Sequence, residues 1–232
     1  NDTRFYTEKC EAMRNFANKI WNASRFVMMN LSIDHYELPA ADKLEREDKW
    51  VLSKLNRLVK EVTENLDSFE IGVASAKVYD FIWDTYCDWY IELTKTRLNG
   101  TDEDAKLTAQ NVLCYVLVTL LKLLHPFMPF ITEEIYQALP KCGGAEDILM
   151  TAQWPEYTEA LSFPAEESAM EAVMDLIRAI RARRAEMNVP PSKKAELMIV
   201  TDQAEPYQQG LHFIQRLAYA SNVTFPELSL IH

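Results

Sequence analysis

The chain of 232 residues is 48% hydrophobic, which is enough for the packed core of one large domain, or of one domain with a small satellite, and excludes a disordered chain. It has only 5 glycines, none in a run that could cradle a phosphate, and this favours helices over turn-rich β architecture. The formal net charge of −11 argues against a protein whose whole surface binds nucleic acid.

Two long amphipathic helices are predicted within the first 67 residues. Between Phe5 and Leu31, apolar side chains recur every three or four residues and indicate one buried helix face. These side chains are Met13, Phe16, Ile20, Ala23, Val27 and Leu31. A polar connection follows, and Asp42 is predicted to cap a second helix that ends near Asp67.

A third helix is predicted from Gly72 to Leu98, where Asn99-Gly100 ends it. It is apolar over most of its circumference and leaves a narrow acidic row at four-residue steps, formed by Asp80, Asp84, Asp88 and Glu92. Like charges at that spacing repel modestly, so we expect the row to face basic groups on a neighbouring element. A carboxylate metal site is the alternative, but no histidine joins the row and we predict no metal there.

The fourth predicted helix, from Asp104 to His125, is apolar almost all round and is expected in the middle of a bundle. Its apolar run from Val112 to Leu124 is too short to span a bilayer, so no membrane segment is expected. The following proline ends the helix, His125 is expected to cap or pack, and Thr132 is predicted to cap a short helix. Residues 140–164 have the proline and glycine content of a loop.

The last part of the chain has a different pattern. An amphipathic helix from Glu166 to Met187 precedes a strand, a helix and a second strand, predicted at Glu196–Val200, Pro206–Tyr219 and Asn222–Phe225. We therefore predict a mainly α fold. An antiparallel helix bundle would occupy residues 1–164, followed by a basic helix and a small α/β subdomain over residues 165–232.

The motifs of common catalytic sites do not occur in the sequence. It contains no phosphate-binding loop, nucleophile elbow, dinucleotide fingerprint or zinc-ligand spacing. The four histidines are isolated, and the four cysteines form no CxxC pair. We expect free thiols in a reducing cytosol, with disulfides or a metal site as the alternatives. The pattern favours binding over catalysis.

The predicted first helix has side chains that contact nucleic acid in other proteins. Beside its apolar stripe lie amides, a guanidinium and flat rings, at Asn18, Trp21, Asn22, Arg25, Phe26 and Asn30. Unpaired RNA bases are read by stacking on aromatic rings and arginines and by hydrogen bonds to base edges. Trp21 and Phe26 could instead pack in the core, because large rings are often buried.

Basic residues are concentrated near the other end of the chain. Residues 31–172 carry a net charge of −14, whereas residues 1–30 and 173–232 carry +2 and +1. The densest run has six basic residues against Glu186 alone, and they are Arg178, Arg181, Arg183, Arg184, Lys193 and Lys194. An acidic protein with a confined basic face can bind RNA through local phosphate contacts. The alternative is an ordinary solvated helix end.

Four motifs in order give the chain a family resemblance: RNFANKIWNASRFVMMNL (14–31), YDFIWDTYCDWYIELTKTRL (79–98), LLHPFMPFITEEIYQALP (123–140) and IRAIRARRAEMNVPPSKK (177–194). Together they resemble the region behind the catalytic domain of class I aminoacyl-tRNA synthetases of the valine, isoleucine and leucine group. The Trp-Asp-x-x-Cys-Asp-Trp-Tyr pattern at 83–90, with the His-Pro-Phe-Met-Pro-Phe run, is similar to the valine enzymes. The resemblance covers essentially the whole chain.

The resemblance implies a role and the residues that perform it. The helical bundle of this family holds the anticodon loop, and valine tRNAs carry adenosine and cytidine at the second and third anticodon positions. By analogy, Asn18, Asn22, Arg25 and Phe26 would touch the splayed bases. The residues lying along the tRNA backbone would be Arg178, Arg181, Arg184, Lys193 and Lys194.

The family's ATP-site signatures HIGH and KMSKS, its editing domain and its C-terminal coiled coil are absent from the sequence. We therefore expect a cytoplasmic, monomeric fragment that recognises valine tRNA but has no catalytic activity and no cofactor of its own. ATP would bind to the missing catalytic domain, which joins valine to its tRNA in the intact enzyme. The alternatives are the same bundle from an isoleucine enzyme, which the tryptophan-rich third helix disfavours, and a helical interaction scaffold without RNA contact.

Overall fold

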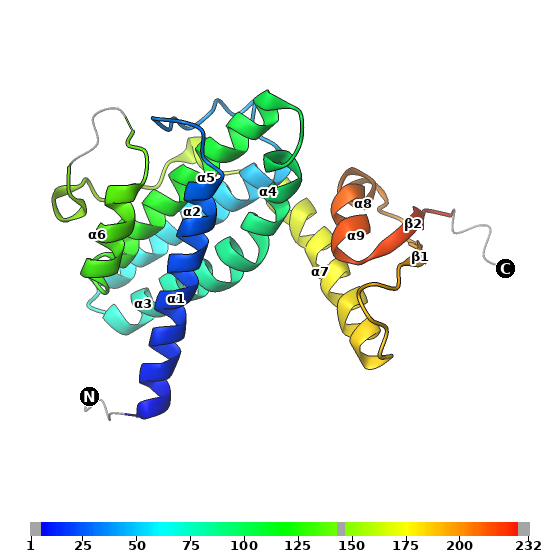
Figure 1. The fold of residues 1–232 in the computed structure, drawn as a ribbon, viewed down its shortest axis with the longest axis horizontal. Coiled ribbons are helices and arrows are strands. Elements are labelled where there is room, and N and C mark those ends of the chain that lie inside the picture. The colour runs from blue at the N-terminus through cyan, green and yellow to red at the C-terminus, as the bar shows by residue number, and fades with distance from the viewer. Residues whose placement is uncertain (1–5, 143–146, 227–232) are drawn as a thin grey trace. The chain divides into compact units, whose positions relative to one another are not determined.

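The computed structural model describes residues 6–142 and 147–226 and forms two compact units, Asn1–Phe163 and Pro164–His232 (Figure 1). The first unit is a helix bundle. The second contains one long helix and a small α/β element. The chain is therefore mainly α with a small α/β part, as the sequence predicts.

The first unit is built from helices that follow one another closely along the chain. They are α1 (Thr7–Met29), α2 (Arg46–Asp67), α3 (Ile71–Asp80), η1 (Phe81–Tyr90), α4 (Ile91–Leu98), α5 (Glu103–Leu124) and α6 (Pro129–Ala138). Two single 3₁₀ turns follow, η2 (Leu149–Thr151) and η3 (Glu159–Leu161). Phe5, the expected first residue of α1, lies outside the described residues.

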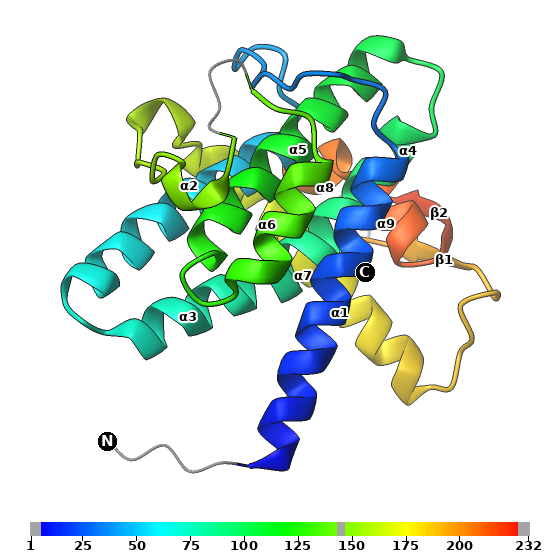
Figure 2. The same cartoon turned by 60° about the vertical axis from the view of Figure 1, so that its left-hand side comes forward.

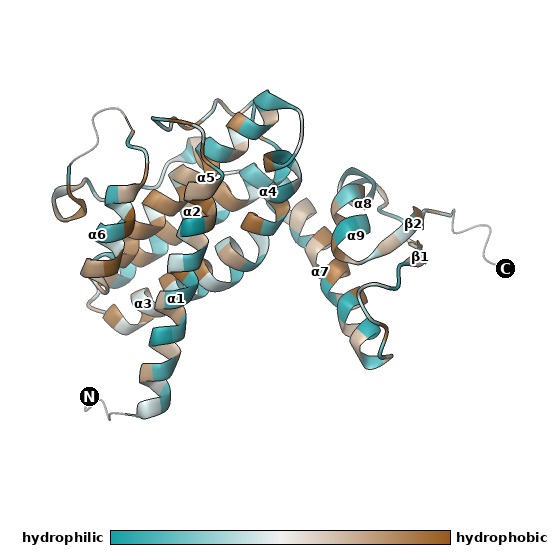
Figure 3. Ribbon diagram, in the orientation of Figure 1, coloured by the Kyte–Doolittle hydropathy of each residue, from teal (hydrophilic) through white to brown (hydrophobic). Residues whose placement is uncertain are grey.

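Helix α5 is the centre of this unit, because it contacts α1, α2, α3, α4 and α6. Its start is fixed by Asp102, whose side chain accepts a hydrogen bond of 3.1 Å from the Ala105 N–H. The helix is long and apolar enough to cross a membrane, but 72% of its most apolar stretch is buried inside the protein, as expected of a core helix. In Figure 3 the hydrophobic colours gather on α5 and on the helix faces turned toward it.

The predicted third helix is continuous, but its middle is π-helical. Residues 81–90 form η1 between two α-helical segments, so this stretch has i→i+5 hydrogen bonds and one extra residue per turn. The acidic row does not face a single neighbouring element. Asp88 faces α1, where its Oδ1 lies 2.7 Å from Lys19 Nζ, and this confirms the ion pair expected for it. Asp84 instead lines a hollow with Lys54 and Arg57 of α2, and its pairing stays a prediction.

Two predicted helix starts are wrong. Helix α2 begins at Arg46 and not behind Asp42, because the Asp48 carboxylate accepts the Glu45 N–H at 3.1 Å and fixes the first turn there. Helix α6 begins at Pro129, since a proline at the first helical position has no N–H to lose. Thr132 is therefore inside α6, fully buried, with its hydroxyl 2.8 Å from Nδ1 of His125.

A buried ionic cluster joins α2 to the η1–α4 helix. The Asp48 carboxylate is fully buried and accepts two hydrogen bonds from Arg97, of 2.6 and 2.8 Å. Tyr90 donates its hydroxyl to the same carboxylate at 2.7 Å. Glu47 lies 3.0 Å from Arg97 as well, so one guanidinium serves two carboxylates. Burial raises the pKa of Glu47 to about 7, because Arg97 opposes the shift only in part and Asp48 adds to it.

The segment behind α6 is held along α2 by polar contacts. The Asn56 amide donates to the Thr158 carbonyl at 2.8 Å and accepts from its N–H at 2.9 Å. Trp154 Nε1 donates to the Thr63 hydroxyl at 2.9 Å. Because these contacts satisfy backbone and ring donors, the segment is ordered without long regular structure.

The second unit consists of α7 (Pro164–Glu186), β1 (Ala195–Met198), α8 (Glu205–Gln209), α9 (Leu211–Leu217) and β2 (Ala220–Thr224), with the two strands paired in parallel. The single helix expected at Pro206–Tyr219 is broken at Gly210. A Cβ atom there would lie 2.7 Å from Val173 Cγ2 of α7, so the break coincides with a close approach that only glycine permits.

The raised pKa of Glu47 predicts a pH-dependent stability. A carboxyl group that holds its proton more tightly when folded stabilises the protein below the unfolded pKa, and this contribution is lost as pH rises through about 7. Glu47→Gln should therefore raise the melting temperature at pH 8 relative to the unchanged protein and have a smaller effect at pH 5. A difference of about 1 kcal/mol corresponds to roughly 2–4 °C in a chain of this size.

Glu61→Gln is the matched control, because Glu61 forms a half-exposed ion pair with Lys77 at 2.7 Å. It should change melting little at either pH. Equal effects of Glu47→Gln at pH 5 and pH 8 would contradict the assignment.

Candidate nucleic-acid interface

An open groove of about 510 Å³ lies between α1 and the η1–α4 helix. Figure 2 shows the C-terminal half of α1 beside α4. Three residues singled out from the sequence line this groove: Asn18, Asn22 and Phe26. The fourth, Arg25, is exposed on α1. The other lining residues are Asn15, Lys19, Ala23, Cys87, Ile91 and Lys95.

The arrangement follows from the periodicity of α1. Phe16, Ile20, Ala23 and Val27 are buried against the bundle, as predicted. Asn15, Asn18 and Asn22 are spaced by three and four residues, so their amides share the neighbouring face and remain exposed. Met13 was expected on the buried stripe but is 48% exposed, because the N-terminal half of α1 extends beyond the other helices (Figure 1).

Phe26 is half-buried at the edge of the groove, and the Lys95 ammonium lies 5.6 Å from the centre of its ring. The Phe26 ring is thus only partly packed in the core, and part of it faces the groove. Trp21 is 39% exposed on α1, so part of the indole is accessible as well. Flat rings beside amides form a surface that suits unpaired bases.

Two lysines border the groove, and neither was singled out from the sequence. Lys19 pairs with Asp88 and lies 3.8 Å from the centre of the Trp83 ring. Lys95 pairs with Glu92 on the same helix. Lys19 could have been predicted from the sequence, because it follows Asn15 by one helical turn and so lies on the same face of α1. Lys95 is distant in sequence, and only the packing of α4 beside α1 brings it to the groove.

Cys87 also lines the groove. Burial raises the pKa of this thiol to about 12, so it stays protonated at neutral pH and is a poor nucleophile. The groove thus offers amides, ammonium groups and a ring, which are groups for binding. Among residues 6–142 and 147–226, no three His, Cys, Asp or Glu side chains gather where they could hold a metal ion.

The basic segment of the second unit is engaged in its own fold. Arg181 donates to the Leu217 carbonyl at 2.7 Å, and Arg184 donates to the carbonyls of Pro190, at 3.0 Å, and of Lys193. Arg178 and Arg183 pair with acidic residues three positions away, Asp175 at 2.6 Å and Glu186 at 2.9 Å.

Lys193 and Lys194 are exposed. The guanidinium groups of Arg181 and Arg184, by contrast, donate hydrogen bonds to backbone carbonyls of their own unit. The two lysines are therefore the members of the basic segment best placed to meet a phosphate.

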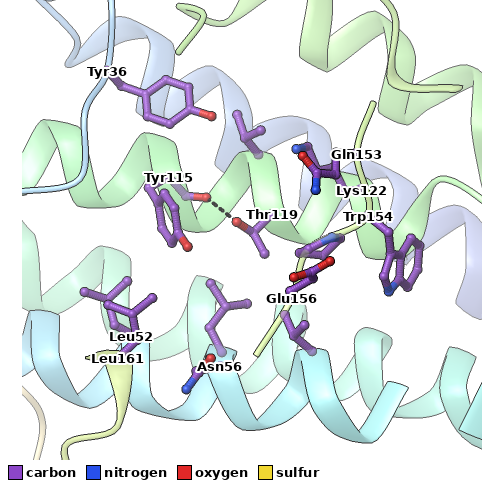
Figure 4. Close-up of a pocket in the computed structure, with 14 residues that line it drawn as sticks. Tyr36, Leu52, Asn56, Tyr115, Thr119, Lys122, Gln153, Trp154, Glu156 and Leu161 are labelled. Carbon is purple, nitrogen blue, oxygen red and sulfur yellow. Dashed lines mark hydrogen bonds between the residues drawn. The ribbon is translucent and has the colours of Figure 1, made fainter. Parts of the chain in front are cut away.

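A second hollow, of about 260 Å³, lies between α2, α5 and the segment 153–161 (Figure 4). Its polar lining includes Tyr36, Asn56, Lys122 and Glu156, and none of the residues predicted for nucleic-acid contact lies there. Burial lowers the pKa of Lys122. The Asn56–Thr158 bonds hold the segment that covers this hollow against α2.

Comparison with known proteins identifies the family of the chain. Residues 48–199 match the family described as the anticodon-binding domain of tRNA ligase. The chain is 52% identical over 97% of its length to a valine–tRNA ligase of Clostridium acetobutylicum, and 41% identical over 96% of its length to one of Staphylococcus carnosus. It spans only about a quarter, 26%, of the length of these relatives. The chain therefore belongs to the family of anticodon-binding domains of tRNA ligases.

Proposed function

We propose that this chain binds the anticodon loop of valine tRNA as one part of a valine–tRNA ligase. The observation that carries the proposal is the groove beside α1, which gathers Asn18, Asn22 and Phe26 with two lysines at its border. The names of the relatives favour valine over isoleucine. In the whole enzyme, another part of the polypeptide would use ATP to join valine to the tRNA.

The chemistry of the groove suits the splayed, unpaired bases of an RNA loop better than a base-paired duplex. Amide side chains both donate and accept hydrogen bonds, so Asn18 and Asn22 are able to read base edges. The half-buried Phe26 ring offers a flat face for stacking, and the exposed Arg25 on the same helix offers a guanidinium plane. The lysines at the border supply phosphate contacts. We further propose that the domain works in the cytoplasm, in a monomeric enzyme.

A helical scaffold without RNA contact is the competing function. Such a scaffold has no need of polar amides and a flat ring around one open groove, whereas an RNA-binding surface uses both. Three possibilities remain: a domain for valine tRNA, a domain for isoleucine tRNA and a scaffold that binds no RNA. Binding to transcribed valine tRNA, measured against isoleucine tRNA and an unrelated tRNA, separates them. Equal affinity for all three RNAs would contradict anticodon recognition.

Phe26→Ala tests the stacking role. Stacking of a base on an aromatic ring contributes roughly 1–3 kcal/mol, so cognate binding should weaken about tenfold or more. A non-cognate tRNA held by phosphate contacts should lose much less. Phe130→Ala is the control, because Phe130 is 90% exposed on α6 and does not line the groove. If Phe26→Ala lowers the melting temperature and weakens both RNAs equally, the ring is structural.

The basic segment is tested by two double variants. Lys193→Gln with Lys194→Gln should weaken cognate and non-cognate tRNA alike and reduce the slope of log affinity against log salt by up to about two units, without changing melting. Arg181→Ala with Arg184→Ala should instead lower the melting temperature, because it removes hydrogen bonds to the carbonyls of Leu217 and Pro190. An unchanged salt slope in the lysine variant would make this segment an ordinary solvated surface.

The chain alone is expected to be catalytically silent. The ATP signatures of the family are absent from its 232 residues, and burial keeps the groove thiol of Cys87 protonated. Valine-dependent exchange of pyrophosphate into ATP should equal that of buffer, while the same preparation binds tRNA. Exchange above buffer that survives repurification would refute this expectation.

A further inference from the structure

The two lysines at the border of the groove are held in the same way. Each ammonium group pairs with a carboxylate of the η1–α4 helix and lies over an aromatic ring. Lys19 lies between Asp88 and Trp83, and Lys95 between Glu92 and Phe26. A carboxylate and a ring face together fix a flexible cation that would otherwise move freely in water.

The two arrangements differ in whether the aromatic ring is packed inside the unit or lines the groove. Trp83 stacks on Tyr79 at 5.8 Å, and Tyr79 packs on the buried Phe16, so the ring below Lys19 belongs to an aromatic stack inside the unit. The ring below Lys95 is Phe26, which lines the groove. At 5.6 Å from the ring centre, Lys95 is near the outer limit of a cation–π contact and therefore weakly held.

We infer that Lys95 gates the Phe26 ring and exchanges partners when RNA binds. This rests on the proposed function, in which Phe26 receives an unpaired base. A base that stacks on the ring face occupied by the ammonium must displace it. Lys95 then leaves Glu92 and binds the phosphate of the stacked nucleotide, while Lys19 stays with Asp88 as a fixed charge.

The exchange is favourable for a simple electrostatic reason. The Lys95 and Glu92 side chains are 36% and 39% exposed, and a solvent-exposed ion pair on one helix contributes little. RNA phosphates carry a dense charge with condensed counterions, whose release favours contact with a lysine. Glu92 thus orients Lys95 in the free domain and competes with the phosphate for it.

The experiment uses the full chain and a hairpin RNA that carries the anticodon loop of valine tRNA. Lys95→Met keeps the length of the side chain but removes its charge, and should weaken binding and reduce the salt slope by somewhat less than one unit. Glu92→Gln removes the competitor, and should tighten binding by up to about fivefold, the range of an exposed ion pair. Asp84→Asn removes one negative charge from the same helix away from the groove and measures the general electrostatic effect.

The decisive measurement is the combination of both changes. In the Lys95→Met background, Glu92→Gln should tighten binding no more than Asp84→Asn does, because there is no ammonium group left to release. Equal tightening with and without Lys95, or an unchanged salt slope in Lys95→Met, overturns the inference. If the hairpin discriminates no anticodon and Phe26→Ala has no effect, the proposed function itself fails, and that outcome is read from the Phe26 variant and the non-cognate hairpin.

Discussion

The buried carboxylate of Asp48 determines how the helices of the first unit meet. Its two oxygens accept four hydrogen bonds, from the Glu45 N–H, the Tyr90 hydroxyl and two nitrogens of Arg97. The start of α2, the end of η1 and the last turn of α4 are thereby tied to one point. A buried ion pair is only a modest net stabiliser, yet removing one partner leaves an uncompensated charge and costs about 3–5 kcal/mol. The cluster therefore specifies one arrangement of helices.

Much of this fold follows from periodicity. The core face of α1 from Phe16 to Val27, the central position of α5 and the order of elements in the second unit were predictable because burial selects apolar side chains at helical spacing. The wrong predictions concern helix starts, where a single contact decides which residue begins the helix. Asp42 and Thr132 are reasonable caps by residue type, but the Asp48 carboxylate and Pro129 set the actual starts of α2 and α6.

The groove was predictable only on the side formed by α1. Asn18, Asn22 and Phe26 share a helix, so their spacing placed them together. Lys95 is far away in sequence and enters through tertiary packing, which no local pattern encodes. The arginines Arg181 and Arg184 illustrate the converse problem, because composition cannot distinguish a guanidinium that binds phosphate from one that binds a backbone carbonyl. In an acidic domain, the position of each basic side chain decides whether it can meet a phosphate.

The π-helical segment has a consequence for how this domain tolerates insertions and deletions. An α-helix turns about 100° per residue, so the extra residue per turn in η1 shifts the angular phase of α4 relative to α3. That phase points Arg97 inward to Asp48 and leaves Lys95 outside, beside Phe26. Losing one residue from 81–90 without a change in helix geometry would rotate α4 by roughly a quarter turn about its axis. A length change there, even at a solvent-facing position, would misplace the core arginine and the groove lysine together, whereas the segment 149–163 has no such phase to keep.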